Sequence, residues 1–530
     1  MTSPASPNPK AEFPFSGLMF VLISVGIFLL HVSLLRLPYF WDEAGYYIPA
    51  ARDLLLKGSL IPLSTPSNAH PPLVMAYVAL WWKVLGSTPA VARCAMLLSA
   101  AFALLGVFRI ARRVANLEVA IAATTCTAVY PVFFAQSTMA HVDLATAGLT
   151  LWGMDSYLGG RNRSTAVWFS LSVLAKETAI LAPLALLAWE LVCPWVSWFL
   201  KQPICIRERS WPAFASLLTP VGVLALWYAY HYARTGYVLG NPEYFRYNVQ
   251  ATMSPLRILL ALLMRLWQVF GYLHLWVLTL LMASAMTRPA ICDGEVERPR
   301  IELPVQCIFG IVILTYVVAL SIIGGAVLAR YMLTAVPLLV ILAVSTLRRR
   351  VQAWRWLVGI VCAAFAAALF WNPPYGFSPE DNLAYRDFIE MHLDAEQFLE
   401  AHYPKATLLT AWPASGEVTQ PFLGYVRQPL RVVRIEDFSP EDVLAAAEER
   451  ARFDVVLAFS TKYEPPHPLV ESPRWWERLK ARFFGYHRDS PPAFIAQVLN
   501  GNVVFREQRQ GQWVAVIELE RVEEARLQRR

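Results

Sequence analysis

Long apolar segments recur along the first 371 residues of this chain and then stop. Runs of this length can cross the hydrocarbon core of a bilayer as helices. They predict a polytopic α-helical membrane protein with about 11 transmembrane helices. No small-residue cleavage site follows the first run, so we expect a retained helix and not a cleaved signal peptide. The runs lie near residues 18–35, 91–108, 119–135, 142–158, 165–178, 179–200, 212–232, 266–286, 305–323, 331–347 and 354–371.

The last 159 residues, 372–530, have a different pattern that predicts a soluble α/β domain. Two helix-like segments are expected at Glu380–His402 and Leu444–Arg452. Strand-like segments with β-branched and aromatic residues alternate with them. We found no nucleophile elbow, phosphate loop or metal motif in this region. We therefore interpret residues 372–530 as a cover or an acceptor-docking module. The expected strands are 406–410, 453–459, 502–507 and 513–518.

Composition agrees with a membrane protein, because 56% of the residues are hydrophobic and only 16% are charged. An ordinary soluble domain carries about 25% charged residues. The net charge of +7 divides into +12 for residues 1–371 and −5 for residues 372–530. The basic excess therefore indicates membrane topology and not nucleic-acid binding. The seven cysteines all precede residue 372 and show no disulfide framework or zinc spacing.

Basic clusters in short loops predict the orientation, because such loops stay cytoplasmic. With the Pro- and Ser-rich residues 1–17 as a disordered cytoplasmic tail, every cluster lies on one side. The first outer loop is then 36–90, and 372–530 is extracytoplasmic. The clusters are Arg109/Arg112/Arg113, Arg161/Arg163, Lys201/Arg207/Arg209, Arg288/Arg298/Arg300 and Arg348/Arg349/Arg350/Arg355.

Two adjacent carboxylates, Asp42 and Glu43, follow the first apolar run among aromatic residues that include Tyr46. Carboxylates beside hydrocarbon usually face a water-filled cavity and mark a site. Asp42 can deprotonate an acceptor hydroxyl, and Glu43 is the second candidate for this role. The structural alternative is that Asp42 caps the surface helix expected over residues 48–56.

Histidines and a further carboxylate lie in the same set of outer loops. His70 precedes Pro71 and Pro72, which either form a rigid bend or bring His70 to the site as a hydrogen-bonding group. His141 and Asp143 begin an apolar segment, where Asp143 can be a helix cap. These two and Asp42 can also share a divalent cation such as Mg²⁺ or Mn²⁺.

Isolated basic residues in outer loops are candidates for binding a phosphate. Lys176 precedes Glu177, and Arg330 precedes Tyr331. Lysine offers a compact charge with three donors, and arginine can bind phosphate through two parallel hydrogen bonds. The alternatives are an interfacial ion pair and snorkelling towards the membrane surface. Glu190, deep in an apolar run, needs a partner but receives no functional role.

These motifs together resemble the GT-C class of membrane glycosyltransferases, and in particular the aminoarabinose transferase and protein O-mannosyltransferase-like branch. The resemblance covers roughly residues 16–371. The motifs that carry it, in chain order, are Asp42-Glu43 with Tyr46 and Ala50-Ala51-Arg52-Asp53-Leu54, His70-Pro71-Pro72-Leu73, Asp143, Ala175-Lys176-Glu177, and Arg330-Tyr331 with Pro337.

The resemblance implies a polyprenyl-phosphate-linked sugar as donor and transfer at the outer face of a plasma membrane, here the bacterial inner membrane. It implies that Asp42 is the base or orients the acceptor, and that Lys176, Arg330 and Arg246 contact the lipid phosphate. Glu177 stands where relatives often have glycine, which weakens the inference for Lys176. The Asp-Glu pair differs from the Asp-x-Asp of metal-dependent members, which argues against an obligatory metal.

The sequence thus predicts an inverting glycosyltransferase that acts on a lipid, glycan or protein hydroxyl and binds no nucleic acid. This prediction requires that ionisable groups from distant outer loops meet in one pocket. A transporter or flippase of lipid-linked sugars is one alternative, although such proteins place ionisable groups near the bilayer midplane and often contain internal repeats. A non-catalytic envelope assembly protein is the other.

Overall fold

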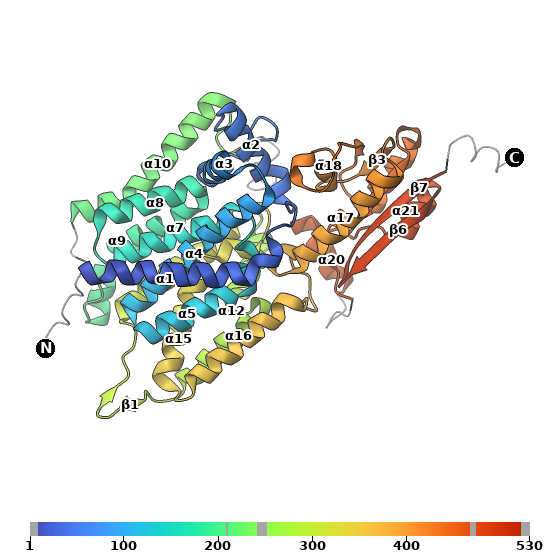
Figure 1. Ribbon diagram of the computed structural model, residues 1–530. Helices are drawn as coiled ribbons and strands as arrows, with labels where there is room; N and C mark the ends of the chain where they lie inside the picture. The colour runs from blue at the N-terminus through green and yellow to red at the C-terminus, as the bar shows by residue number, and fades with distance from the viewer. Residues whose placement is uncertain (1–8, 208–209, 241–251, 467–472, 521–530) are drawn as a thin grey trace. The chain divides into compact units, whose positions relative to one another are not determined.

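A computed structural model describes residues 9–207, 210–240, 252–466 and 473–520 of the chain (Figure 1). The chain divides into two compact units that are each built from separate stretches of sequence. The first comprises Met1–Ser33, Ser67–Trp81 and Arg93–Ala368. The second comprises Leu34–Pro66, Trp82–Ala92 and Leu369–Arg530.

The first unit is a bundle of α-helices. Helices α7, α8, α9 and α10 lie side by side, and α7 packs on α8 while α10 packs on both α8 and α9 (Figure 1). The helices are α1 (Pro9–His31), α3 (Leu73–Leu85), α4 (Pro89–Val114), α5 (Leu117–Val129), α6 (Pro131–Gln136), α7 (Val142–Leu158), α8 (Asn162–Ala175), α9 (Leu181–Leu200), α10 (Trp211–Thr235), α12 (Pro255–Phe270), α13 (Leu275–Met286), α14 (Leu303–Ile322), α15 (Ala335–Arg350) and α16 (Trp354–Phe370). Short turns η3 (Glu177–Ile180), η5 (Tyr272–His274) and η6 (Ala329–Met332) and a hairpin of β1 (Cys292–Asp293) and β2 (Val296–Glu297) connect them.

Six helical segments in the described part of the chain are long and apolar enough to cross a membrane. The chain is an integral membrane protein, as the apolar pattern predicted. Every predicted apolar run lies largely within one or more helices, whereas the number of about 11 spans stays a prediction. The six segments are Ser16–Leu34, Pro89–Val114, Glu177–Leu200, Trp211–Thr235, Pro255–Met286 and Leu303–Ile322.

Small residues allow the central helices to approach closely. A Cβ added at Gly148 of α7 would lie 2.8 Å from the Cβ of Ala103 on α4. A Cβ at Gly153 would lie 2.6 Å from the ring of Phe169 on α8. Close contact at small residues is a common way for membrane helices to associate, because lipid provides little hydrophobic drive for helix pairing.

Asp155 near the end of α7 binds three arginines that the topology analysis placed in cytoplasmic loops. Its buried carboxylate accepts from Arg113 Nε at 2.8 Å, Arg161 Nη2 at 2.7 Å and Arg109 Nε at 3.2 Å. A buried carboxylate is stable only when paired and hydrogen-bonded, so these contacts account for its position. Residues from two predicted loop clusters are thereby joined at one end of the bundle.

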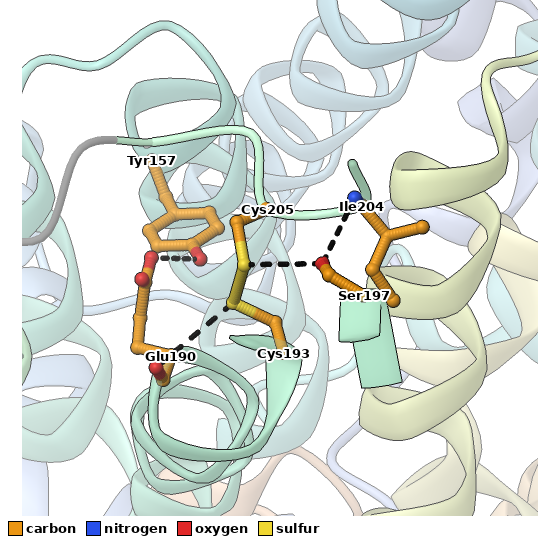
Figure 2. Close-up of a disulfide and its surroundings, with 6 residues drawn as sticks. All are labelled: Tyr157, Glu190, Cys193, Ser197, Ile204 and Cys205. Atoms are coloured by element: carbon orange, nitrogen blue, oxygen red, sulfur yellow. Dashed lines mark hydrogen bonds between the residues drawn. A yellow bond between two sulfur atoms is a disulfide. The ribbon is translucent and has the colours of Figure 1, made fainter. Parts of the chain in front are cut away.

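A disulfide joins Cys193 of α9 to Cys205, with an S–S distance of 2.32 Å (Figure 2). This disulfide was not predicted from the sequence, because one pair separated by 12 residues leaves no spacing pattern to recognise. Beside it, the hydroxyl of Tyr157 donates to Glu190 Oε1 at 2.6 Å (Figure 2). Glu190 therefore has the partner that its burial requires.

The second unit contains a five-stranded mixed sheet with strand order β4-β3-β5-β7-β6. β3 pairs in parallel with β4 and β5, and β7 pairs antiparallel with β5 and β6. Every residue of the central strand β5 is buried, which explains its continuous apolar sequence. The strands are β3 (Thr407–Thr410), β4 (Arg431–Arg434), β5 (Val455–Phe459), β6 (Gly501–Arg509) and β7 (Gln512–Leu519).

Helices and short turns complete the second unit, and the α/β prediction for the C-terminal region is confirmed. The predicted helix at 380–402 is α17, and the segment at 444–452 overlaps α19. Strand β4 and helices α18, α20 and α21 were not predicted. The helical elements are η2 (Glu43–Tyr47), α2 (Ile48–Lys57), η7 (Pro379–Asp381), α17 (Ala384–His402), α18 (Ala414–Glu417), η8 (Pro421–Leu423), α19 (Pro440–Glu448), η9 (Arg450–Arg452), α20 (Arg474–Phe484) and α21 (Pro492–Leu499).

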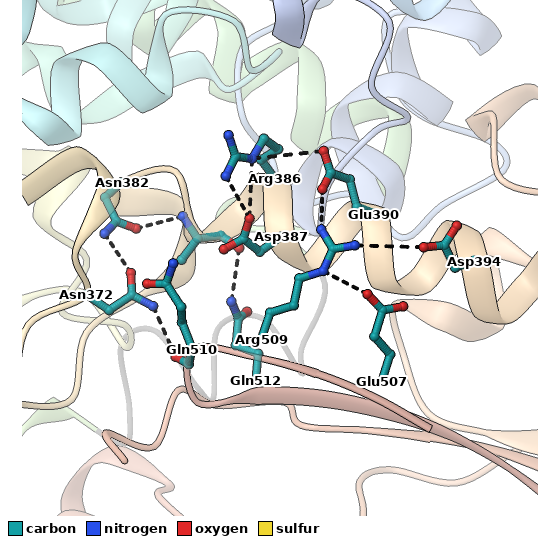
Figure 3. Close-up of polar contacts among 11 residues, drawn as sticks. Asn372, Asn382, Arg386, Asp387, Glu390, Asp394, Glu507, Arg509, Gln510 and Gln512 are labelled. Carbon is teal, nitrogen blue, oxygen red and sulfur yellow. Dashed lines mark hydrogen bonds and ion pairs between the residues drawn. The ribbon is translucent and has the colours of Figure 1, made fainter. Parts of the chain in front are cut away.

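Polar contacts attach α17 to the β6–β7 hairpin. Figure 3 shows Arg509 of β6 reaching towards α17, where it pairs with Glu390 and lies 3.9 Å from Asp394. At the start of the same helix, Gln512 Nε2 donates to the carbonyl of Ala384 at 3.0 Å. These contacts fix the helix against one edge of the sheet.

Residues 36–90, expected as one outer loop, contain two helices. The helix expected at 48–56 is α2, whereas α3 was not foreseen. Helix α12 likewise begins at Pro255, before the run predicted from 266. The boundaries predicted for the membrane and extracytoplasmic domains stay predictions.

Candidate active site

Asp42 lies at the start of the π-helical turn η2 in the second unit and is half-buried. Its carboxylate accepts no hydrogen bond from the first backbone N–H groups of this turn, so the capping alternative is not supported. The preceding residue, Trp41, has a φ of +46°, in the left-handed region that a bulky residue rarely adopts. Such strain and π-helical turns both occur preferentially at functional sites.

Glu43 and Tyr46 contribute to the structure of the same turn. Glu43 is fully buried, and its Oε2 accepts a hydrogen bond from the backbone N–H of Phe40 at 2.9 Å. The Tyr46 ring lies 6.1 Å from that of Trp412, which also packs edge-on against Trp41 at 5.2 Å. Of the two acidic residues, Asp42 is thus the less buried, whereas Glu43 holds the backbone of the turn.

In the first unit, two cations converge on the carboxylate of Asp143. Lys176 Nζ donates to Asp143 Oδ1 at 2.6 Å, and Arg330 Nε lies 3.2 Å from Oδ2. All three side chains are at most about 5% exposed. The snorkelling alternative for Lys176 and Arg330 is therefore contradicted. Asp143 lies in the first turn of α7, but it binds these cations and the cap position belongs to His141.

Local backbone structure brings these residues to one end of the helices. Helix α8 ends at Ala175, and Lys176 is extended, with φ −157° and ψ 137°, before η3 begins. Because α8 follows α7 through a short turn and packs antiparallel to it, the end of α8 lies beside the start of α7. This arrangement places Lys176 beside Asp143.

The ring of Tyr331 lies next to several cations. Lys176 Nζ is 4.0 Å from the ring centroid, and the Cζ atoms of Arg265 and Arg330 are 5.3 Å and 5.8 Å away. Cations at these distances from an aromatic face are attracted by its quadrupole. Tyr331 therefore helps to hold positive charge in a buried environment.

His141 is placed by the same group of residues. Its Nδ1 lies 2.8 Å from Gln136 Oε1 and 3.2 Å from Arg330 Nη1. His141 is fully buried. It therefore orients the arginine side chain and connects it to α6.

His70 and Glu177 form a second pair beside the first. His70 Nδ1 lies 2.7 Å from Glu177 Oε2. The backbone of this loop is held by α10, because Trp227 Nε1 donates to the carbonyl of Ala69 at 2.9 Å, and Ala69 has a φ of +59°. The chain bends at Pro72, directly before α3 begins, and His70 makes its polar contact just before this bend. Glu177 pairs with His70, while Lys176 pairs with Asp143.

Sequence reasoning missed two polar residues of α12 that hold the loop before Arg330. Arg265 Nη1 donates to the carbonyl of Leu328 at 2.7 Å, and Gln268 Nε2 donates to that of Val327 at 2.8 Å. Both side chains are buried. The sequence feature that could have identified them is an arginine within an apolar segment, because ionisable residues in such segments usually mark a functional site in membrane proteins.

Two expectations about the site stay predictions. Arg246 lies outside the described residues. Asp42 and Lys176 belong to different compact units, so the prediction that they act on one sugar stays a prediction. Within the first unit, Asp143, Lys176, Arg330, Tyr331 and His141 do lie together. Their chemical roles stay predictions.

Comparison with protein families places residues 69–221 in a match to the family of dolichyl-phosphate-mannose-protein mannosyltransferases. The matched segment begins just before His70 and includes His141, Asp143 and Lys176. A comparison with curated protein sequences found no match.

The whole chain is similar in structure to ArnT from Cupriavidus metallidurans. The apo form aligns with a TM-score of 0.54 and 14% identity over 96% of this chain and 98% of ArnT. The form bound to undecaprenyl phosphate aligns with a TM-score of 0.50 and 14% identity over 94% and 97%. At this identity the likeness establishes the fold and not the chemistry. The fold and the family match together confirm the resemblance to the GT-C class of membrane glycosyltransferases that the sequence motifs predicted.

Proposed function

We propose that this chain is an inverting glycosyltransferase that moves a sugar from a polyprenyl-phosphate donor to a hydroxyl acceptor at the outer face of the membrane. One observation carries the proposal: Lys176 and Arg330 converge on Asp143 in a buried position of a chain with the ArnT fold. Undecaprenyl phosphate is bound in one of the ArnT structures. Lipid phosphate is the anion that a pair of buried cations beside a membrane would meet.

Lys176 and Arg330 bind the phosphate of the donor. An ammonium has three donors and a guanidinium five, so each retains N–H groups beyond the one directed at Asp143. As the bond between the sugar C1 and the phosphate oxygen breaks, negative charge develops on the phosphate. Fixed donors aimed at that charge stabilise the transition state, and one such donor is worth about 10²–10³ in kcat.

Asp42 accepts the proton of the acceptor hydroxyl. The acceptor oxygen forms a bond to C1 while the C1–O bond to phosphate breaks, and polyprenyl phosphate leaves with the bonding electrons. The acceptor proton moves to the Asp42 carboxylate. Attack from the side opposite the leaving group inverts the anomeric carbon. The strained Trp41 backbone and the packing on Trp412 hold Asp42 in place.

The proposed mechanism has no step through a metal. Asp143, one of the ligands considered for Mg²⁺ or Mn²⁺, has one oxygen on Lys176 and the other beside Arg330. A divalent cation bound there would be repelled by both side chains. His141 lies 3.2 Å from Arg330 Nη1 and is subject to the same repulsion.

The transferase is favoured over a flippase or an assembly protein. The charged pairs gather where α7 begins and α8 ends, and not midway along these helices. With the N-terminus in the cytoplasm of a bacterial cell, these helix ends face the periplasm, together with a lipid, glycan or protein acceptor.

The test is release of free polyprenyl phosphate from a polyprenyl-phosphate sugar by the purified chain in lipid vesicles, with extracted envelope lipids as acceptor. Asp42→Asn is expected to abolish release while thermal unfolding stays unchanged. Asp394→Asn, an exposed carboxylate on α17, is the control and should retain full activity. Full activity of Asp42→Asn would exclude Asp42 as the base, and no release by the wild type would refute the transferase.

A further inference from the structure

Three ionisable side chains to which the proposed reaction assigns no role are buried together in the second unit. His392 and Glu396 are one turn apart on α17, so they lie on the same face of the helix. Glu417 is the last residue of α18. Each of the three is at most 1% exposed. Carboxylates are almost never buried to this extent unless they are paired or bind a metal.

Their ligand atoms converge on one point. One such atom from each residue lies within 4.8 Å of the other two. His392 Nδ1 is 2.8 Å from Glu417 Oε2 and 3.9 Å from Glu396 Oε1. Donors bonded to Zn²⁺ at 2.0–2.2 Å in a tetrahedral arrangement are about 3.4 Å apart. The observed separations bracket this value.

The His392 ring is clamped in the orientation that the cluster requires. It stacks on Phe388 with 3.9 Å between ring centroids, and the ring of Phe459 meets it edge-on at 4.8 Å. Phe388 is on the same helix and Phe459 ends the central strand β5. The imidazole is thus held on both sides by apolar rings while Nδ1 faces the carboxylates.

The cluster lacks the hydrogen bonds that its burial demands. Among the described residues, no partner satisfies either oxygen of Glu396, Oε1 of Glu417 or Nε2 of His392, unless one carboxyl carries a proton and donates to the other. The carboxylates of Glu396 and Glu417 offer ligand oxygens within 4.8 Å of each other. Two negative charges at this distance in an apolar interior are unstable without compensation.

A proton and a divalent cation are the two ways to compensate these charges. One proton shared between Glu396 and Glu417 Oε1 creates one hydrogen bond and leaves one oxygen of Glu396 unsatisfied. A divalent cation neutralises both carboxylates and binds the imidazole as well. Both unsatisfied oxygens of Glu396 can then serve as ligands, which gives four donors from three residues.

We propose that His392, Glu396 and Glu417 bind a structural Zn²⁺ ion within the C-terminal part of the chain. One imidazole with carboxylate oxygens is a ligand set that suits zinc, and a buried site without an open position is typical of a structural ion. The ion joins α17 to α18. Trp412, which packs against the Asp42 turn, is two residues before α18, so the ion also fixes a support of that turn.

The test measures the zinc content of the full-length chain purified in detergent and dialysed against metal-free buffer. Wild type and Asp394→Asn are expected to retain one zinc equivalent more than Glu396→Gln. Added Zn²⁺ should raise the Tm of the stripped wild type by on the order of 5–10 °C at saturating concentration and leave that of Glu396→Gln unchanged. Asp394→Asn removes an exposed carboxylate from the same helix and controls for surface charge.

The amide of Gln resembles a protonated Glu carboxyl but is a poor metal ligand. The Glu396→Gln variant therefore distinguishes a cluster held by a shared proton from one held by a metal ion. If a shared proton holds the cluster, Glu396→Gln remains as stable as the wild type and contains the same amount of zinc, and the proposal is overturned. Glu417→Gln repeats the measurement from α18. Should both variants fail to fold, zinc X-ray absorption of the wild type decides, because a shell of one imidazole with oxygens supports the site and its absence refutes it.

Discussion

Replacing Lys176 by Gln tests the phosphate-binding proposal most directly. Lys176 Nζ lies 2.6 Å from Asp143 Oδ1, and the variant leaves this carboxylate with Arg330 as a cationic partner at 3.2 Å. The fold should therefore persist. What is lost is a charge-assisted hydrogen bond to the phosphate, worth about 1.5–3 kcal/mol. This corresponds to an increase of about 10- to 150-fold in the inhibition constant of free polyprenyl phosphate.

The assay measures inhibition of sugar transfer by added polyprenyl phosphate, together with thermal unfolding of each variant. Lys83→Gln, which removes an exposed lysine of α3, is the matched control and should bind the inhibitor like the wild type. A structural role alone would lower the Tm without changing the inhibition constant. An unchanged inhibition constant for an active Lys176→Gln variant would refute the assignment of Lys176 to the phosphate.

Three further predictions concern parts of the chain outside this pair. Gly45→Ala places a Cβ 2.6 Å from the ring of Trp412, so it should destabilise the chain by about 1–3 kcal/mol in thermal unfolding, whereas Gly359→Ala, with nothing within 4 Å, should not. Burial raises the pKa of Asp53, but hydrogen bonds from residues 63 and 64 outweigh this and lower it below 3.8. Ionised Asp53 therefore stabilises the fold above about pH 3.8, and this contribution is lost as the pH falls through the lowered pKa. The Tm of Asp53→Asn should fall less on acidification than the Tm of the wild type. An equal fall in both proteins would contradict the reasoning. The exposed thiol of Cys292 should react with a membrane-impermeant maleimide in inverted vesicles but not in intact cells, and the opposite result would reverse the predicted orientation.

The sequence predicted the membrane helices well because their signal is local. A run of about 20 apolar residues, such as that of α14, has no other stable place than a bilayer or a core. Helix α3 was missed because its 13 residues are too few to span and follow a pair of prolines. Strand β4 was missed because its four residues, Arg-Val-Val-Arg, form an edge strand whose pairing with β3 is a tertiary property.

The hydrogen-bonding partners of Lys176 and Glu177 could not be predicted from the local sequence. Lys176 and Glu177 are adjacent in the sequence, yet each has its hydrogen-bonding partner in another part of the fold. Neighbouring residues at a helix end point in different directions, and the break after Ala175 sends Lys176 towards Asp143 and Glu177 towards His70. Which partner each of these two residues reaches depends on how α7, α8 and the loop before α3 pack. Sequence spacing does not encode it.

The position of Asp143 between two cations has a consequence for the proposed reaction. Two buried cations without an anion would be unstable, and Asp143 supplies that charge when no donor is bound. A donor phosphodiester carries one negative charge, whereas the departing phosphate monoester approaches two. In the proposed reaction, Lys176 and Arg330 would therefore interact more strongly with the phosphate as the C1–O bond breaks. Interactions that strengthen in the transition state speed the chemical step, whereas equal binding of substrate and transition state does not. The same preference makes free polyprenyl phosphate a strong product inhibitor, so the cations that accelerate transfer should also slow product release.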